Sequence, residues 1–397
     1  MIDFELSAEE LKILKDAHEQ SEKVVRPVSR YYDEHEHESP TELINRMWST
    51  DRSGITGGLG VVGGMRIEEV CWGDVGLMLT NPGSGLGGAA IMASGTGEQQ
   101  MKFLKRFNEG EPKWGAMAMT EPGCGSDTSA IQTTAVRDGN EWVLNGEKIF
   151  VTCGQRAAEI PGGLIVVWAT VDKSAGRAGM KPFIVEGGTP GMKVEKLEKK
   201  LGIRASDTAA ISFVDCRIPY ENILGSPEVR NTESGSTAGF RRAMATFAAT
   251  RPIIAAMALG VGRAALDFVK EELEKQGVKI RYGTPKTKLT SIERDVMEME
   301  SAYKAARMLM LRAMWLMGTF QSNSLEASMA KAKAGLAVTR ITQKAVEIMG
   351  PLGYSRNWLL EKWMRDGKIN DIFEGTGQIN TLIIARRILG FSREQLK

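Results

Sequence analysis

The sequence predicts an α+β fold in which a helical segment, a β-rich segment and a second helical segment follow one another along 397 residues. Three observations support this: helical periodicity near the N-terminus, short β-favouring runs in the middle, and a long apolar helical pattern towards the C-terminus. A chain of this length exceeds one core of ordinary size. We therefore expect three domains, at residues 1–112, 113–226 and 227–397.

The N-terminal segment is expected to be helical. Apolar residues recur at roughly helical spacing at Leu6, Leu11, Leu14 and Ala17. Ser7 followed by Glu10 resembles a capping box, which marks the start of a helix. The glycine-rich stretch 54–97 carries apolar runs such as VGLMLT and AAIMAS, and it predicts short helices joined by tight turns.

The middle segment changes to strand signals. Its β-favouring runs are WGAMAMTEP, TTAVRDGNEWVLNGEKIFVT, LIVVWATV, KPFIVEG and AAISFVDCRIP. Turn dipeptides such as Asn145-Gly146 and Pro190-Gly191 separate them. Strands this closely spaced leave no room for crossover helices, so they predict an antiparallel sheet or barrel.

Helical signals return after about residue 231 and continue to the end. Residues 295–318 contain six methionines among leucines and alanines, at Met297, Met299, Met308, Met310, Met314 and Met317. A helix that is apolar over much of its circumference is expected in a bundle core or a subunit interface. We interpret the methionines as core rather than as a binding groove.

Composition and charge exclude several classes of protein. Lys plus Arg number 51 against 49 Asp plus Glu, and this balance argues against nucleic acid as the main partner. The acidic, amphipathic start does not resemble a signal peptide, and no run of about 18 apolar residues predicts a membrane span. The four cysteines show no CxxC spacing, so reduced thiols in a cytoplasmic protein are expected.

No metal site is expected. The His and Glu residues of 34–38 alternate at i, i+2, which cannot place them on one helical face, so a solvated acidic loop is the favoured interpretation. The chain also lacks HExxH, GxSxG and P-loop motifs.

Two segments could carry chemistry. Residues 120–127, TEPGCGSD, form a glycine-containing loop whose amides and hydroxyls could hold a phosphate or a heteroaromatic edge. A structural turn without a ligand is the alternative interpretation of the same residues. Residues 371–378, DIFEGTGQ, place Glu374 between an aromatic residue and a glycine. That carboxylate could be catalytic, or an anion favoured by the dipole of a following helix.

Together the two segments resemble the acyl-CoA dehydrogenase family over nearly the whole chain. The resemblance lies in five collinear blocks: MTEPGCGSD, NGEKIFVTCG, LGIRASDTAAISFVDCRIPYENILG, TRPIIAAMALGVGRAALD and MRDGKINDIFEGTGQIN. It implies an N-terminal helical domain, a middle antiparallel β-domain and a C-terminal four-helix bundle, with FAD bound between subunits.

By this resemblance, Glu374 is the base that removes the substrate's α-proton while the β-hydrogen leaves as hydride to the flavin. The implied flavin contacts are Met119, Thr120, Gly125, Ser126, Phe150, Thr152, Thr376 and Gln378, and, from a neighbouring subunit, Lys279, Glu347 and Gly350. The implied acyl-CoA contacts are Ser126, Arg251 and Gly375. One branch of the family carries its base immediately before the arginine matched by Arg251; this chain has Thr250 there, which cannot serve.

Several positions that usually reach a neighbour's FAD depart from the family pattern. Lys279 replaces an arginine, Thr290 a glutamine, and Glu347 the glutamine of a QxxGG segment. Lysine cannot reproduce the forked contact of arginine, and a glutamate beside a pyrophosphate is unfavourable. A heterotetramer with a homologous chain, as in some actinobacteria, and an ordinary homotetramer with local compensation both explain these changes.

The resemblance implies a trans-2-enoyl-CoA product and an electron-transfer flavoprotein as acceptor. An acyl-CoA oxidase and a non-catalytic subunit of a heteromeric dehydrogenase are the competing interpretations. The sequence does not indicate which acyl group is bound.

Overall fold

A computed structural model describes residues 5–50, 60–229, 238–392 and 395. The N-terminal part is helical: α1 Ala8–Gln20, η1 Ser21–Val25, α2 Arg26–Glu34, α3 Thr41–Thr50, α4 Val61–Met78, α5 Gly85–Ser94, α6 Gly97–Leu104 and η2 Lys105–Asn108. The predicted capping box is present, because the Ser7 hydroxyl accepts from the Glu10 amide at 3.2 Å and Glu10 Oε2 accepts from the Ser7 amide at 2.8 Å. Leu11 is 54% exposed, so α1 buries less of its apolar face than its spacing predicts.

In the glycine-rich stretch, the described residues form α4 and α5, which a non-helical segment at residues 79–84 joins; residues 54–59 lie outside the described part. Helix α4 is interrupted at Asp74, whose backbone is extended (φ −164°, ψ 120°). The Asp74 carboxylate accepts from the Leu77 amide at 2.8 Å and so restarts the helix after the break.

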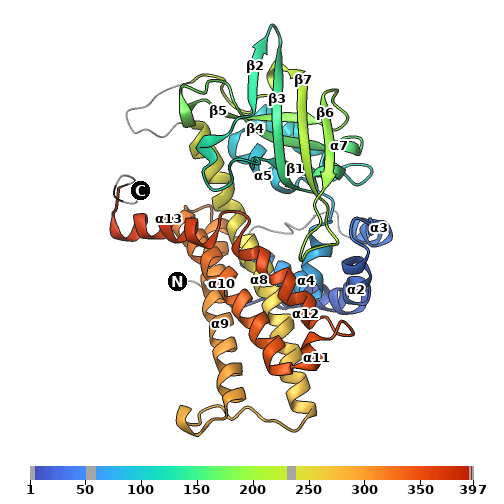
Figure 1. Cartoon of the computed structure of the whole chain (residues 1–397), viewed down its shortest axis with the longest axis vertical. Helices are drawn as coiled ribbons and strands as arrows, with labels where there is room; N and C mark the ends of the chain where they lie inside the picture. The colour runs from blue at the N-terminus through green and yellow to red at the C-terminus, as the bar shows by residue number, and fades with distance from the viewer. Residues whose placement is uncertain (1–4, 51–59, 230–237, 393–394, 396–397) are drawn as a thin grey trace.

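The middle part contains one seven-stranded sheet with short helices at its edges (Figure 1). Its strands are β1 Gly115–Ala118, β2 Thr134–Asp138, β3 Glu141–Thr152, β4 Leu164–Thr170, β5 Met180–Glu186, β6 Met192–Leu197 and β7 Thr208–Pro219. Between and after the strands lie η3 Thr128–Ala130, α7 Gly154–Glu159, η4 Gly176–Ala178 and η5 Tyr220–Asn222. The strands lie in the order β1-β4-β2-β3-β7-β6, with β5 also paired to β4.

The sheet is mixed, which corrects the prediction of purely antiparallel pairing. The pairs β2–β3, β3–β7, β4–β5 and β6–β7 are antiparallel, but β4 runs parallel to β1 and to β2. Residues 119–163, which contain two strands and α7, connect β1 to β4 and supply a crossover that the close spacing of the strand segments does not predict. All seven residues of β4 are buried, as expected for a strand covered on both faces.

The C-terminal part is helical: α8 Ala238–Lys275, η6 Lys286–Lys288, α9 Ser291–Gly318, α10 Ser324–Met349, α11 Pro351–Tyr354, α12 Leu360–Lys368, η7 Ile369–Asp371 and α13 Gly377–Leu389. The long helices α8, α9 and α10 lie side by side (Figure 1). Helix α12 packs against both α8 and α10 and supplies the fourth helix of the bundle. Met299, Met310 and Met314 are buried in its core, whereas Met308 is 50% exposed.

One hydrophobic core joins the two helical parts, because buried residues of α4 pack with those of α8, α9, α10 and α12. Residues 245–275 of α8 are long and apolar enough to span a bilayer, but 78% of their most apolar window is buried inside the fold. Burial of this kind is the behaviour of a core helix. The first half of α8 also contacts β5 and thereby connects the bundle to the sheet (Figure 1).

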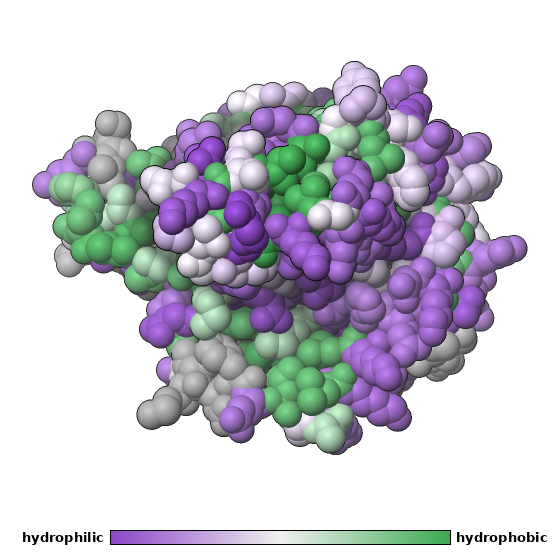
Figure 2. All heavy atoms as spheres, turned by 90° about the horizontal axis from the view of Figure 1, so that it is seen from below, coloured by the Kyte–Doolittle hydropathy of each residue, from purple (hydrophilic) through white to green (hydrophobic). Residues whose placement is uncertain are grey.

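The lower face of the molecule carries apolar side chains among polar ones (Figure 2). Seen from below, hydrophilic side chains surround separate apolar spots (Figure 2). The four cysteines, Cys71, Cys124, Cys153 and Cys216, are buried and form no disulfide.

Candidate active site

Glu374 lies in a tight turn between η7 and α13. Glu374 and Gly375 both have left-handed backbones, with φ of 57° and 89°. This conformation is unfavourable for a residue with a side chain and persists only where the surroundings impose it. Here Arg251 Nε donates to the Glu374 carbonyl at 3.3 Å, and the Gly375 carbonyl accepts from Lys331 Nζ at 2.5 Å and from Asn380 Nδ2 at 2.8 Å.

The Glu374 side chain is partly buried, and desolvation of its carboxyl group raises its pKa above the ordinary glutamate value. Three groups oppose the rise. Thr250 Oγ1 donates to Glu374 Oε2 at 2.7 Å, and the positive charges of Arg251 and Lys331 favour the ionised form. The net direction is upward, towards the range in which a carboxylate is a stronger base.

Helix α8 carries two adjacent side chains to this turn. Thr250 and Arg251 are both buried, and Arg251 NH1 also donates to Ser328 Oγ at 3.2 Å. In the sequence alone, Thr250 is notable only because it stands where one branch of the family carries its base. The structure shows that its hydroxyl binds the carboxylate of the proposed base, a contact that its position next to Arg251 in the sequence could have suggested.

The loop 119–126 is shaped by a buried ion pair. Glu121 Oε1 accepts from Lys148 Nζ at 2.7 Å, and the same carboxylate accepts from the amides of Gln132 and Thr133 at 2.6 and 3.0 Å. Lys148 also donates to the Met119 carbonyl at 3.1 Å. The loop therefore has a structural part, in which Glu121 fixes its conformation, and an exposed part, at Gly125 and Ser126, that could bind a ligand.

The exposed part of this loop offers polar groups without partners among the described residues. Gly125 and Ser126 are exposed, and among the residues that the structure describes none accepts from their amides. Likewise, no described side chain or carbonyl bonds to the hydroxyls of Thr120, Ser126 or Thr152. Behind the loop, the completely buried Trp168 packs with Met119, and its indole N–H has no partner in the described part of the chain. Unsatisfied donors of this kind fit a polar ligand.

Phe150 lies in a β-bulge. The register of β3 against β7 shifts between Lys148 and Val151, and Phe150 has a left-handed backbone with φ of 57°. A bulge re-aims side chains, and here it leaves the Phe150 ring 59% exposed. An exposed aromatic residue on a strained backbone is a candidate for stacking on a planar ligand.

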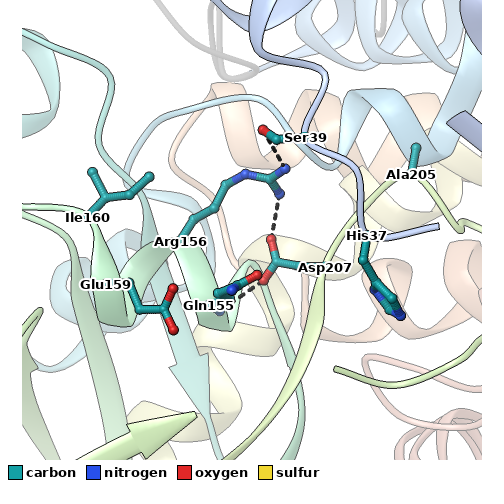
Figure 3. Close-up of a pocket in the computed structure, with 8 residues that line it drawn as sticks. All are labelled: His37, Ser39, Gln155, Arg156, Glu159, Ile160, Ala205 and Asp207. Atoms are coloured by element: carbon teal, nitrogen blue, oxygen red, sulfur yellow. Dashed lines mark hydrogen bonds and ion pairs between the residues drawn. The ribbon is translucent and has the colours of Figure 1, made fainter. Parts of the chain in front are cut away.

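A cavity of about 210 Å³ lies beside the end of β3, next to α7 (Figure 3). Arg156 NH1 donates to Asp207 Oδ1 at 2.5 Å and Arg156 NH2 to Ser39 Oγ at 3.2 Å, and Asp207 Oδ2 accepts from the Gln155 amide at 2.9 Å. The cavity contains none of the predicted site residues. Its ion pair instead holds the chain that follows Thr152 in place.

Phe247 connects the sheet to the Glu374 turn. Its ring packs against the cluster that contains Met119 and Cys124, and the Arg251 guanidinium lies 5.5 Å from its centroid. Arg251 in turn donates to Glu374. The structure thus brings the loop after β1 and the Glu374 turn to the same part of α8.

The remaining predicted residues lie in two places. Thr376 begins α13, and its hydroxyl accepts from the Ile379 amide at 3.2 Å, which leaves the hydroxyl proton free to donate; Gln378 is exposed on the first turn. Lys279 lies between α8 and α9, and Glu347 and Gly350 end α10. Within the described part of one chain, no hydrogen bond or ion pair joins these three to Glu374, and Glu347 pairs with Lys344 at 2.8 Å.

Thr290, one of the unusual positions, has a local structural role. Thr290 caps α9 in a capping box with Glu293, and Arg281 Nε donates to Glu293 at 2.7 Å. No group of three or more potential metal ligands occurs in the described residues.

Comparison with known proteins decides the family. The chain matches the acyl-CoA dehydrogenase N-terminal domain over residues 7–111, the middle domain over 116–216 and the C-terminal domain over 237–389. The chain belongs to the acyl-CoA dehydrogenase family. It is an oxidoreductase of the class that dehydrogenates acyl-CoA, and the cofactor of the family is FAD.

Individual relatives share the whole length. The short-chain specific acyl-CoA dehydrogenase of Clostridium acetobutylicum is 33% identical over 398 residues, covering 98% of this chain and 100% of that protein. The acryloyl-CoA reductase (NADH) of Anaerotignum propionicum is 33% identical, with 98% and 96% covered. The structure of butyryl-CoA dehydrogenase from Megasphaera elsdenii matches with a TM-score of 0.84 at 32% identity, with 98% and 100% covered.

The acyl-CoA dehydrogenase fold expected from the resemblance is confirmed, whereas the suggestion of a heteromeric, actinobacterial-type member is not borne out by these relatives. The residues present fit FAD. The free hydroxyls and amides of the loop after β1 suit the polar arm of the cofactor, and the exposed Phe150 ring suits its planar part.

Proposed function

We propose that this chain catalyses the FAD-dependent α,β-dehydrogenation of an acyl-CoA thioester to the trans-2-enoyl-CoA, with Glu374 as the base. The observation that carries the proposal is the partly buried Glu374 carboxyl group, which has a raised pKa, a hydrogen bond from Thr250, and a place on a turn held by buried cations. Perturbed carboxylates in such settings are frequent general bases.

In the proposed reaction, Glu374 and Arg251 have different roles. Glu374 accepts the proton from the α-carbon of the thioester on a carboxylate oxygen. The Glu374 amide, from which no described residue accepts, donates to the thioester carbonyl and stabilises the negative charge that develops there. Arg251, which is buried and bonded to the Glu374 carbonyl, keeps this turn against α8.

Thr120, Ser126 and Thr152, with Met119, Gly125 and Phe150, would hold the FAD from the same chain, and Thr376 and Gln378 would approach it from α13. FAD, when bound, supplies the acceptor for the hydride that leaves the β-carbon. Lys279, Glu347 and Gly350 would reach the FAD of another subunit in an assembly of identical chains, a homotetramer. An electron-transfer flavoprotein would reoxidise the cofactor.

The proposed substrates are short-chain acyl-CoA thioesters. Support comes from the short-chain specific and butyryl-CoA dehydrogenases, which match this chain over nearly its full length. A panel of purified acyl-CoA substrates (short, long, branched and steroid) with an artificial electron acceptor tests this. Highest kcat/KM on a substrate longer than about eight carbons would refute the short-chain assignment.

The decisive test of the reaction is Glu374→Gln. The variant is expected to remain folded and yellow but to lose turnover by about 10³-fold or more, since the amide cannot accept the proton. Glu9→Gln, which changes an exposed glutamate on α1, is the control and should keep most activity. Retained turnover in Glu374→Gln would rule out Glu374 as the base.

Further assays distinguish the dehydrogenase from an oxidase and from a reductase. Hydrogen peroxide formed from acyl-CoA without an added acceptor would indicate an oxidase. The acryloyl-CoA reductase relative favours one more assay, the NADH-dependent reduction of a 2-enoyl-CoA by the purified chain. A homo-oligomer with one FAD per chain is expected, and a chain that binds FAD only with a second, homologous chain would contradict the proposed assembly.

A further inference from the structure

Two buried cations hold consecutive carbonyls of the Glu374 turn. The Glu374 carbonyl accepts from Arg251 on α8, and the Gly375 carbonyl accepts from Lys331 on α10. Helices α8 and α10 lie side by side in the bundle (Figure 1). Both helices therefore hold the turn. The residue that does so from α10, Lys331, has no assigned part in the proton transfer proposed above.

Lys331 is an unusual residue to bury. Its side chain is inaccessible to solvent, and no carboxylate of the described residues lies within 4.0 Å of its Nζ. Its hydrogen-bond acceptor is a neutral carbonyl, that of Gly375. A buried ammonium group without a directly bonded anion is unfavourable, so packing alone does not explain why a lysine stands there.

The charged groups around Lys331 come from three elements: Asp371 of η7, Glu374 of the turn and Arg251 of α8. Burial lowers the pKa of Lys331 to about 8, against the opposing effect of the two carboxylates. The same positive charge favours the ionised form of Glu374. Lys331 is thus coupled to the proposed base both through the backbone and through its charge.

The direction of the carbonyls sets the direction of the amides. In a trans peptide the N–H points opposite to the C=O, so directing the carbonyls of Glu374 and Gly375 into the bundle turns the amides of Gly375 and Thr376 the other way. Among the residues that the structure describes, none accepts from the amides of Glu374, Gly375 or Thr376. The turn therefore presents three unpaired donors next to the Glu374 side chain.

We propose that Lys331 is a positioning residue, which fixes the left-handed Glu374–Gly375 turn through the Gly375 carbonyl and so aligns the Glu374 carboxylate and the neighbouring amides. This inference rests on the proposed role of Glu374 as the base. Asn380 supports the same carbonyl from α13, at 2.8 Å.

The test compares Lys331→Met with Lys333→Met, which removes an exposed lysine two positions along α10. In Lys331→Met we expect kcat to fall about tenfold or more, because small misplacements at a reacting centre are costly, while KM changes less than about threefold. Loss of the positive charge should also move the acid limb of the kcat–pH profile to higher pH. Lys331→Arg keeps the charge and should restore the position of that limb.

A second measurement reports on proton abstraction separately from hydride transfer to the cofactor. Exchange of the substrate's α-proton with deuterium in D₂O should slow in parallel with kcat, since it depends on the base and its alignment. Unchanged kcat, acid limb and exchange rate relative to Lys333→Met would overturn the proposal. If Lys331→Met does not fold, Lys331→Gln decides on the same three measurements. Turnover in Glu374→Gln would instead defeat the proposed function, so the two failures are distinguishable.

Discussion

The Thr250 hydroxyl donates a hydrogen bond of 2.7 Å to the carboxylate of Glu374, across 124 residues of sequence. The hydroxyl also lies 3.2 Å from the Thr246 carbonyl one turn earlier on α8, which indicates a shared or alternating proton. Thr250 is buried, so water does not replace this contact readily. It is the shortest polar contact of the Glu374 carboxylate among the described residues, and it stabilises the charged form.

Thr250→Val is therefore expected to raise the pKa of Glu374. Glu374 must be ionised to accept a proton, so the acid limb of the kcat–pH profile should move to higher pH by roughly one unit, the equivalent of a hydrogen bond to a charged group of about 1.5 kcal/mol. Measurement of kcat between pH 5 and 9, within about the ordinary assay range, checks this. Thr250→Ser should keep the profile, as should Thr339→Val, whose hydroxyl bonds only its own helix.

Glu121→Gln should destabilise the protein strongly. Lys148 is completely buried and would lose its carboxylate partner, and breaking a buried ion pair by removing one member costs about 3–5 kcal/mol. FAD affinity should fall as well, because Glu121 shapes the loop that carries Ser126. Denaturant unfolding and flavin titration measure the two effects. Glu141→Gln removes an exposed partner of Arg217 and should cost less than about 1 kcal/mol; an equal cost in both variants would contradict the assignment.

Phe150→Gly should separate stability from cofactor binding. Phe150 is exposed and left-handed, so glycine relieves backbone strain, and we expect the FAD-free protein to gain about 1 kcal/mol of unfolding free energy. Flavin affinity should fall because a stacking surface is lost. Val136→Gly, at an exposed strand position outside the left-handed region, should lose stability instead. A destabilised Phe150→Gly with unchanged FAD affinity would show that the ring serves packing.

Lys331→Met should be more stable than the parent protein at neutral pH. The pKa of Lys331 is lowered to about 8 in the fold from 10.5, so the unfolded chain binds more protons between these values, and burial of the charge destabilises the fold fully below pH 8. That penalty corresponds to roughly 3 kcal/mol, from which the lost hydrogen bond subtracts about 1 kcal/mol.

The stability gain of Lys331→Met should therefore be present at pH 7 and decline as the pH rises from about 8 to 10.5. Urea unfolding at several pH values measures it. A constant difference across this window would mean that the lysine has the same pKa in the fold as in the unfolded chain. Greater stability with lower activity is the expected trade-off at a residue retained for function.

Local chemistry made part of the structure predictable. The capping box of Ser7 and Glu10 lies within four residues, and its geometry follows from the residue types. The alternation of helical and strand segments is similarly local. Glu374 could be singled out through its neighbours in the sequence and the collinear family blocks, although nothing local distinguishes a base from a helix-terminal anion.

Long-range packing decided the rest. The parallel pairing of β4 with β1 and β2 depends on how residues 119–163 cross the sheet, and no short pattern encodes that path. Thr250 looked inert in the sequence because its partner is 124 residues away. Lys331 looked like any helical lysine, since only the packing of α10 against the Glu374 turn removes its ammonium group from water.

By itself, therefore, the sequence determined the order of helical and β segments, the family and the identity of the candidate base, because each depends on residue types at short or collinear spacing. Only the tertiary structure decided how that base is held. Thr250 and Arg251 reach it from α8 and Lys331 from α10, and its backbone is left-handed. The pKa of Glu374 depends on desolvation and on these charges, which exist only once α8, α10 and the turn are packed together.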